Sequence, residues 1–100
     1  MKERFLGMSR YKSRPMYYVY LLLSGKDGNF YTGSTDDLKR RITEHDAGYV
    51  KATINRRPLK LIYYEACLNE ADARKREEYL KSGMGKKYLR NHLQNYLKDL

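Results

Sequence analysis

The chain has 100 residues, which is enough for one domain and too few for two. Its 13% of aromatic residues argues against a disordered chain, and its formal net charge of +9 predicts attraction to a polyanion. Nucleic acid is the commonest such partner; anionic lipid, a ribosome surface, or a basic surface that serves solubility alone are the alternatives.

The cysteine and hydropathy patterns indicate a reducing, aqueous compartment. Cys67 is the only cysteine, which excludes an intramolecular disulfide and a cysteine metal cluster. Its apolar neighbours favour a buried small side chain over a nucleophile. No apolar run approaches the roughly 20 residues that cross a bilayer, and the first residues do not resemble a signal peptide. We therefore expect a cytoplasmic protein without membrane contacts.

Two segments differ in composition. Residues 1–16 carry five basic side chains against one acid and show no sustained period, so we predict a flexible basic arm. Residues 17–100 are expected to form the single folded domain.

The domain should begin with a β-hairpin. The run 16–23 is short, β-prone and bounded by Ser24-Gly25, which predicts a strand with both faces covered. Residues 26–29 form a turn around Asp27-Gly28, and 30–32 form a second strand that ends at Gly33.

A helix is predicted over 36–46. Ser34 and Asp37 have the spacing of a capping box, and Ala47-Gly48 is a typical helix end. A basic loop covers 48–58. The following strand, 59–67, should alternate, with Leu59, Leu61 and Tyr63 on one face.

Two more helices complete the chain. Asn69 can cap a helix over 70–82, the segment 83–85 should break it, and residues 86–99 have helical periodicity. Strands and helices are mixed, and the hairpin is local. We therefore predict an α+β fold, with a small three-stranded antiparallel sheet flanked by about three helices.

Several side chains in these elements are candidates for chemistry. Tyr18, Tyr20 and Leu22 share one strand face, and Tyr31 adds a hydroxyl on the neighbouring strand. These phenols can simply fill a half-buried sheet. Arg41 and His45 lie four residues apart on one helix face, where an arginine can bind a phosphate, or where both can face solvent.

Glu77 is the most informative candidate. Ala73, Glu77, Leu80 and Met84 follow spacings of four, three and four, which predicts one stripe facing the sheet. A carboxylate on such a stripe is costly unless it is paired or binds a cation. It could form a structural salt bridge, for example with Arg41, or it could bind Mg²⁺ together with substrate phosphate.

The order of these residues resembles the GIY-YIG nuclease family. Tyr18-Val19-Tyr20, ten residues, and Tyr31-Thr32-Gly33 are similar to its two-part signature, and Arg41, His45 and Glu77 follow at its spacings. The similarity covers roughly residues 17–90 and is greatest to short, stand-alone bacterial members of the UPF0213 type. Tyr18 replaces the first signature glycine, and Thr32 stands in the middle of the second triplet.

The resemblance implies a three-stranded antiparallel sheet with helices and metal-dependent cleavage of DNA phosphodiesters. Tyr20 would be the general base or its helper, and Tyr31 would position water or phosphate. Arg41 would stabilise the transition state with help from His45, and Glu77 would hold one Mg²⁺ or Mn²⁺. The resemblance does not decide which of the two tyrosines takes the proton.

We therefore expect a monomeric, structure-selective DNA endonuclease connected with repair. Basic side chains that would contact the nucleic acid backbone lie on the first helix and in the loop after it: Lys39, Arg40, Lys51, Arg56 and Arg57. A non-catalytic nucleic-acid-binding module is the main alternative, and a ribosome- or RNA-associated structural protein is a third. The enzyme hypothesis requires Glu77 to turn toward the tyrosine hairpin and to share a water-accessible hollow with Arg41.

Overall fold

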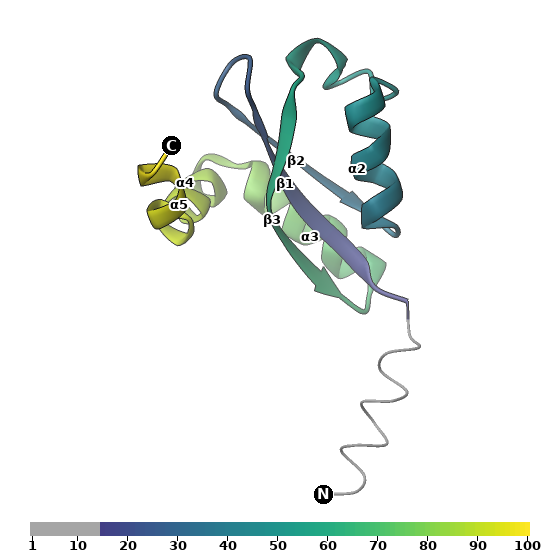
Figure 1. The fold of residues 1–100 in the computed structure, drawn as a ribbon. Coiled ribbons are helices and arrows are strands. Elements are labelled where there is room, and N and C mark those ends of the chain that lie inside the picture. The colour runs from purple at the N-terminus through teal and green to yellow at the C-terminus, as the bar shows by residue number, and fades with distance from the viewer. Residues whose placement is uncertain (1–14) are drawn as a thin grey trace, which may run out of the picture.

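The sheet is built on the central strand of a hairpin. In the computed structural model, which describes residues 15–100, β1 pairs antiparallel with both neighbours, so the strand order is β2-β1-β3 (Figure 1). The elements in chain order are β1 Tyr17–Ser24, β2 Phe30–Thr35, α2 Leu38–Ala47, the short 3₁₀ helix η1 Ile54–Arg56, β3 Leu59–Cys67, α3 Glu70–Lys81, α4 Gly83–His92 and α5 Gln94–Lys98. The predicted α+β fold is confirmed. The arm predicted over 1–16 lies almost wholly outside the described residues.

The turn of the hairpin forms as the Asp27-Gly28 pair predicts. Gly28 adopts a left-handed φ of 71° and its amide donates to the carbonyl of Ser24 at 2.9 Å. The expected end of β2 at Gly33 is wrong, because the strand continues to Thr35. Gly33 pairs with Tyr20 in the middle of the ladder. A residue without a side chain is therefore needed there because of the space above β1, and not because the chain turns.

Helix α2 begins at a different cap from the one predicted. The side chain of Asp37, and not that of Ser34, accepts from the amide of Arg40 at 3.0 Å. Ser34 still belongs to β2 and its hydroxyl is bonded elsewhere. The predicted end is confirmed: Gly48 has a φ of 82°, and its amide donates to the last turn of the helix.

Strand β3 has the predicted bounds but not the predicted alternation. Leu21 pairs with Tyr63 whereas Leu22 pairs with Leu61, which leaves Ile62 as the extra residue of a bulge. Ile62 and Tyr63 therefore both pack against the main hydrophobic core. Tyr63 does not share a face with Leu61, as the simple period of two had predicted.

The two C-terminal helices differ most from the prediction. Asn69 caps α3 as expected, with its side chain accepting from the amides of Ala71 and Asp72. The segment 83–85 does not separate the helices, because Ser82 caps α4 and Gly83 is already its first residue. The expected helix 86–99 is interrupted at Leu93, so α4 and α5 are separate.

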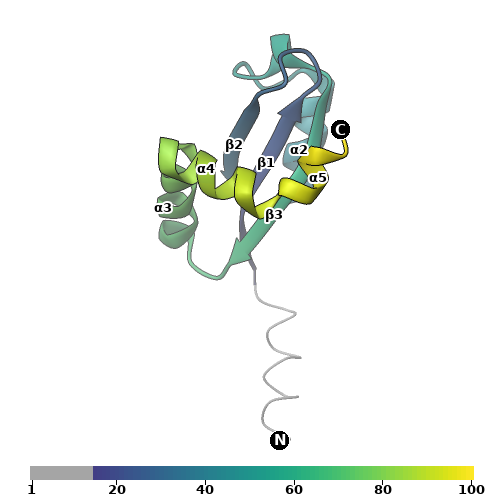
Figure 2. The same ribbon diagram turned by 90° about the vertical axis from the view of Figure 1, so that its left-hand side faces the viewer.

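The helices cover the two faces of the sheet unequally. Figure 2 shows α4 and α5 on the near side of the sheet, α2 behind it, and α3 beside β2. The core between the sheet, α3 and α4 consists of Val19, Leu21, Ala73, Leu80 and Leu89. Cys67, expected to be buried, is only partly buried and packs at the edge of this core. Met84, predicted to complete the inward stripe of α3, is instead 75% exposed in α4. None of the helices within residues 15–100 has the length and apolarity to cross a membrane.

Candidate active site

Three of the predicted side chains meet on the face of the sheet covered by α2. The rings of Tyr20, Tyr31 and His45 lie edge-to-face or tilted, with centroid distances of 5.3 to 6.5 Å. The Tyr20 hydroxyl is hydrogen-bonded to Nε2 of His45 at 2.8 Å. Tyr20 comes from β1, Tyr31 from β2 and His45 from α2, so the fold brings together residues up to 25 positions apart.

Glycine makes room for the central phenol. Gly33 lies opposite Tyr20 in the ladder, and a Cβ atom there would overlap the Tyr20 hydroxyl. Tyr20 is 1% exposed, and this burial raises its pKa to about 12. The cation of Arg41 opposes that rise, whereas Tyr31 and Glu77 add to it. The hydroxyl is therefore protonated at neutral pH, and its pKa depends on Arg41, Tyr31 and Glu77.

Thr53 is a fourth member of this group, and it was not predicted. Its hydroxyl is hydrogen-bonded at 2.7 Å to Nδ1 of His45, which is fully buried. Burial lowers the pKa of His45 below its ordinary value, and the nearby cation of Arg41 lowers it further. The sequence contained one usable signal, since a buried histidine needs a partner on each nitrogen and Thr53 is a hydroxyl-bearing residue in the loop after the helix.

Arg41 lies on the turn of α2 before His45. Its guanidinium forms an ion pair with Glu44 at 3.1 Å and lies near enough to the Tyr20 hydroxyl for each group to influence the pKa of the other. Both of these partners raise the pKa of Arg41, with Tyr20 the larger cause. About a third of its side chain remains exposed (35%), so the cation can reach a ligand in the solvent.

Glu77 reaches the site from the other side of β2. One carboxylate oxygen accepts a hydrogen bond from Ser34, and the other lies 2.6 Å from Nζ of Lys81. The structural alternative, a salt bridge of Glu77, is therefore formed, but with Lys81 and not with Arg41, the partner given as an example. The Glu77 side chain is 19% exposed, and its bond to Lys81 raises the pKa of that lysine above its ordinary value. Glu77 is thus a largely covered carboxylate with a partner on each oxygen.

A polar hollow joins the two helices at this edge of the sheet. It has a volume of about 320 Å³ and lies between the first turns of α2 and α3. Arg41 and Ser34 line it directly, and Glu77 is bonded to Ser34 in its wall. The remaining lining residues are Tyr17, Thr35, Asp36, Arg40, Glu70, Ala73 and Arg74. Arg41 therefore lines the hollow, whereas Glu77 does not line it and is connected to it through Ser34, so the shared hollow that the enzyme hypothesis requires is formed only in part.

The donor set for a metal is small. Among residues 15–100, no three histidine, cysteine, aspartate or glutamate side chains converge to hold an ion. Glu77 offers a single carboxylate. Mg²⁺ commonly binds through one or two carboxylates and completes its shell with water and substrate phosphate. The residues therefore fit an ion that binds together with substrate, and they do not form a closed cage.

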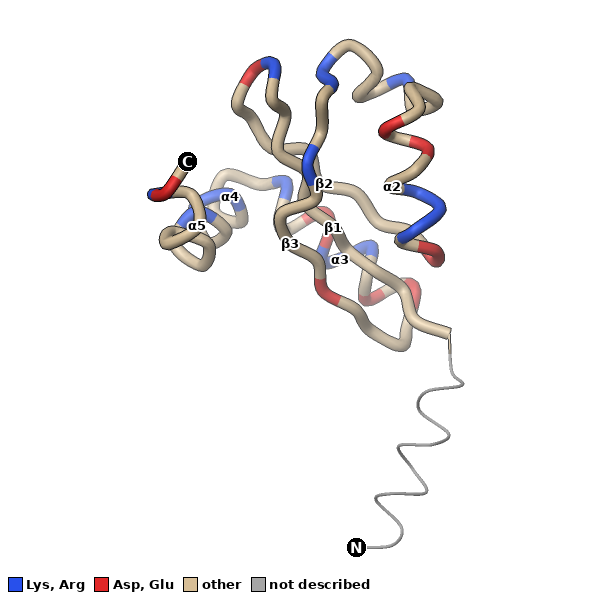
Figure 3. The backbone as a smooth tube through the Cα atoms, in the orientation of Figure 1, with Lys and Arg blue, Asp and Glu red and all other residues tan. Residues whose placement is uncertain are grey.

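The basic residues expected to contact nucleic acid fall into two groups. Figure 3 shows lysines and arginines at the start of α2 and around the loop before β3. Lys39 and Lys51 are exposed, and Arg40 pairs with Asp36 at 3.0 Å. Arg56 is instead held by Asp27 at 2.8 Å, and Arg57 donates to two carbonyls of the polypeptide.

The sequence comparisons identify the family. Residues 16–91 match the model of the GIY-YIG catalytic domain. The chain belongs to the GIY-YIG family. Nuclease domains of this family act on nucleic acid.

The relatives are short GIY-YIG proteins named UPF0213. One from Desulfotalea psychrophila is 43% identical over 68% of this chain and 63% of its own length. One from Staphylococcus saprophyticus is 37% identical over 74% of this chain and 90% of its own length. The solution NMR structure of a UPF0213 protein from Bacillus halodurans is 38% identical, covers 74% of this chain and 81% of that chain, and has a TM-score of 0.48.

Proposed function

We propose that this chain is a metal-dependent endonuclease domain that hydrolyses DNA phosphodiesters, prefers branched or single-stranded structures, and contributes to DNA repair. The observation that supports this most is the meeting of Tyr20, Tyr31 and His45 on the face of the sheet covered by α2, with Arg41 of the same helix lining the hollow. Glu77 of α3 is connected to that hollow through its hydrogen bond with Ser34. A domain that only binds polyanions has no need of a carboxylate at that point.

The residues fit the requirements of phosphodiester hydrolysis. Water attacks phosphorus, the bond to the leaving oxygen breaks, and the attacking water gives up a proton. In our proposal the phenolate form of Tyr20, whose own proton has gone to solvent, accepts that proton, with His45 bonded to its oxygen. Tyr31 positions the water or a phosphate oxygen, and Arg41 stabilises the charge that develops on the phosphorane.

Glu77 would hold Mg²⁺ or Mn²⁺, which would stabilise charge on the phosphate and its leaving oxygen. Lys81 occupies one oxygen of that carboxylate, so the ion would have to displace the lysine. Lys81 keeps Glu77 paired until then, which avoids an isolated carboxylate at a largely covered position. Ser34 holds the other oxygen and fixes the direction of the carboxylate.

The test compares cleavage and binding in the same preparations. The purified chain is incubated with flap, junction, single-stranded and duplex DNA, in Mg²⁺, Mn²⁺ or excess chelator. We expect cutting of the first three substrates with either metal. Glu77→Gln should abolish cutting while DNA binding persists, and Arg41→Ala should reduce the rate by about 10²–10³-fold. Glu78→Gln, the same change at the neighbouring exposed acid, is the matched control and should cut normally.

One observation favours the alternative, a non-catalytic nucleic-acid-binding module. The ion pair between Lys81 and Glu77 closes the position that a metal would take. In that case no substrate is cut in any metal, whereas binding persists with a steep dependence on salt. Cutting that survives in Glu77→Gln or in chelator would contradict the proposed site.

A further inference from the structure

A cluster of stacked planar side chains lies on the surface of α3 and α4. Cζ of the Arg76 guanidinium lies 5.1 Å from the ring centre of Tyr88 and 5.6 Å from that of Tyr79. The imidazole of His92 stacks on Tyr88 with a centroid distance of 5.4 Å and 11° between the planes. These four residues, Arg76 and Tyr79 of α3 and Tyr88 and His92 of α4, are named the stacked cluster.

The stacked cluster is exposed and already ordered. Tyr79 is 40% exposed, Tyr88 is 36% exposed, and His92 is also exposed. Glu65 of β3 holds the guanidinium of Arg76 with two hydrogen bonds of 2.7 and 3.2 Å. This ion pair accounts for the position of Arg76, but it does not require three exposed rings around that side chain. Because the rings are not part of the apolar core either, they are available to a ligand.

The segment 79–98 carries positive charge without acids. It contains five lysines or arginines and no aspartate or glutamate. Within residues 15–100, Lys81 is the only one of the five that has an acidic partner. Lys86 and Lys87 are exposed and directly precede the tyrosine of α4, so two unpaired cations accompany the rings. Figure 3 shows basic positions along α4 and α5. The five basic residues are Lys81, Lys86, Lys87, Arg90 and Lys98.

The basic residues of α2 have a different setting. Residues 36–46 contain three lysines or arginines and four acids, so their charges are balanced. Arg40 and Arg41 both form ion pairs with acids of the same segment. The one aromatic side chain of this segment, His45, is fully buried. Excess positive charge and exposed rings therefore coincide on α3 and α4 and not on α2.

Rings beside unpaired cations suit one kind of nucleic acid. In an unpaired strand the faces of the bases are free to stack on aromatic or guanidinium planes, while lysines attract the phosphates. The bases of a duplex are already stacked on one another, so a duplex can use only the lysines. We propose that the stacked cluster, together with Lys86 and Lys87, binds an unpaired DNA strand. This inference rests on the proposed nuclease function and names the part of the substrate that is recognised, the single-stranded arm of a flap or branched DNA.

Helix α3 connects this surface to the candidate active site. Arg76 turns toward Glu65 of β3, whereas the next residue, Glu77, turns toward Ser34 of β2. The stacked cluster and the wall of the hollow are therefore separated by one helix, whose diameter with side chains is about 10–12 Å. A few unpaired nucleotides span that distance, so one strand can stack on the cluster and bring a phosphate to the hollow.

The first measurement compares two forms of DNA in excess chelator, so that nothing is cut. Fluorescence anisotropy gives the affinity for a labelled oligothymidylate and for a duplex of the same length. Tyr88→Ala should lower the affinity for the single strand by about tenfold and that for the duplex by less than about twofold. Tyr88→Phe keeps the ring and should retain both affinities. Tyr49→Ala, the matched control, removes a ring that is 81% exposed after α2 and should change neither.

The second measurement tests the cations beside the rings. Lys87→Gln removes one unpaired charge, so the slope of log K against log salt should fall by about 0.7 for the single strand. Tyr88→Ala should leave that slope unchanged, because stacking releases no counterions. A slope that Lys87→Gln does not change would contradict the proposed path of the phosphates and overturn the inference.

The outcomes separate this inference from the nuclease proposal. Tyr88→Ala with the affinity of the unmodified chain, or with equal losses for single strand and duplex, overturns the binding surface. If the unmodified chain still cuts flap DNA in Mg²⁺, the nuclease proposal survives that result. Binding to the single strand that depends on Tyr88, in a chain that cuts no DNA, would support the surface and count against the nuclease proposal alone.

The last measurement does not depend on the folding of a variant. Backbone amide spectra establish whether each variant is folded. If Tyr88→Ala does not fold, the unmodified chain is titrated with oligothymidylate, and the amide resonances of Tyr79 and Tyr88 should shift more than that of Tyr49. Equal shifts at the three tyrosines, or no shifts, overturn the inference.

Discussion

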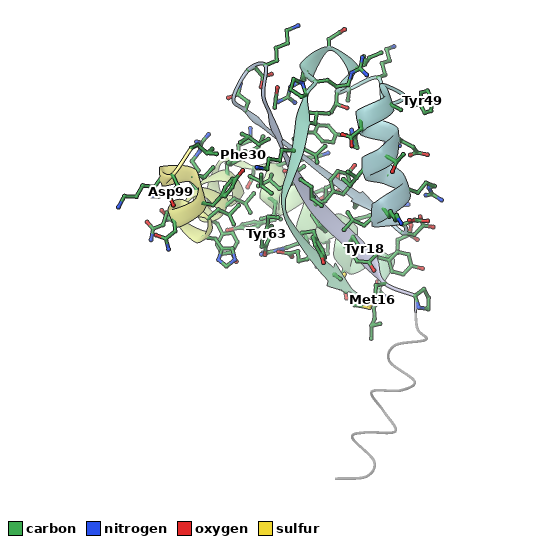
Figure 4. All side chains as sticks on the ribbon, in the orientation of Figure 1. Met16, Tyr18, Phe30, Tyr49, Tyr63 and Asp99 are labelled. Atoms are coloured by element: carbon green, nitrogen blue, oxygen red, sulfur yellow. The ribbon has the colours of Figure 1, made fainter. Side chains whose placement is uncertain are left out.

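The two faces of β1 are equally buried but have different chemistry. On the side of α3 and α4, Val19 and Leu21 pack against Ala73, Leu80 and Leu89, and this cluster is apolar throughout. On the side of α2, Tyr20 is packed with His45 and Thr53, all bonded through polar atoms. Figure 4 shows the same division farther along the sheet, with Tyr18 on the side of α2 and Tyr63 toward α4.

The difference separates stability from function. Burial of an apolar side chain stabilises a fold directly, whereas a buried hydrogen-bonded group recovers little more than its desolvation cost. A polar cluster at the depth of a core therefore indicates a use other than stability. The comparison predicts that substitutions on one face lower the free energy of unfolding, and that substitutions on the other mainly lower the rate.

The largest expected effect is on the apolar face. Leu89 is fully buried, and Leu89→Ala should lower the free energy of unfolding by about 2–5 kcal/mol. Met84, 75% exposed on the same helix, is the control, and Met84→Ala should change it by less than about 0.5 kcal/mol. Urea titration measures both. Equal effects would show that α4 does not pack as described.

A pair of glycines gives a sharper contrast, because the same substitution affects each face differently. In Gly85→Ala the new Cβ would overlap the carbonyl of Tyr79, which is backbone and cannot move aside, so we expect a loss of about 1–3 kcal/mol in stability. In Gly33→Ala it would overlap the Tyr20 hydroxyl, which must turn away from His45. The rate should fall by about 10²-fold with a smaller loss of stability. Urea titration and single-turnover cleavage together distinguish the two.

The pH dependence of cleavage tests which phenol on the polar face is the base. Because burial raises the pKa of Tyr20 to about 12, its phenolate fraction increases about tenfold per pH unit below that value. We therefore expect kcat/KM to rise with pH between about 7 and 9, with a slope near one. Tyr31→Phe should retain the slope at a lower rate, and Tyr20→Phe should abolish cleavage. A slope that persists in Tyr20→Phe would assign the proton transfer to another group.

The smallest expected effect concerns the loop that connects α2 to β3. Lys51 is exposed, and Lys51→Gln should lower the slope of log K against log salt by about 0.9, equally for all DNA sequences, because it removes a single charge that faces a phosphate. Arg56→Gln is the comparison within the same loop. Because Arg56 is held by Asp27 and by the carbonyls of Asn29 and Phe30, this substitution should loosen the hairpin turn more than it changes the salt dependence. Fluorescence anisotropy over a range of salt concentrations measures the binding of both variants.

Local patterns predicted most of the elements. The bounds of β3, the Asn69 cap and the Gly48 end follow from neighbouring residues alone, and the structure confirms them. The errors arise where a tertiary contact overrides the local pattern. Ser34 has the spacing of a cap, but its hydroxyl donates to Glu77, which is 43 residues away. Gly85 suggests a break, but the close approach of α4 to α3 is what requires it.

Residue type and order predicted which side chains form the candidate site. They did not predict the hydrogen bonds and ion pairs that hold these side chains. The grouping of Tyr20, Tyr31 and His45 follows from a hairpin and a helix that covers it. Three contacts have no local signature: the Thr53 bond, the Lys81 pair of Glu77, and the engagement of Arg56 with Asp27. Each depends on how a loop or helix end is placed against a distant element, which a single sequence does not encode in its periodicity.

The bulge at Ile62 determines which side chains of β3 reach each layer. Beyond it, Tyr64 lies opposite Tyr20, and Glu65 lies opposite Val19, where it pairs with Arg76 at 2.7 Å. If the same residues formed a regular ladder from the Leu22–Leu61 pair onward, Tyr63 would lie opposite Tyr20, and Glu65 would lie opposite Tyr18. Glu65 would then stand on the face of the sheet that carries Tyr20 and raise the cost of forming a phenolate, while Arg76 would lose its partner. The bulge therefore keeps a second carboxylate away from the phenols of the candidate site.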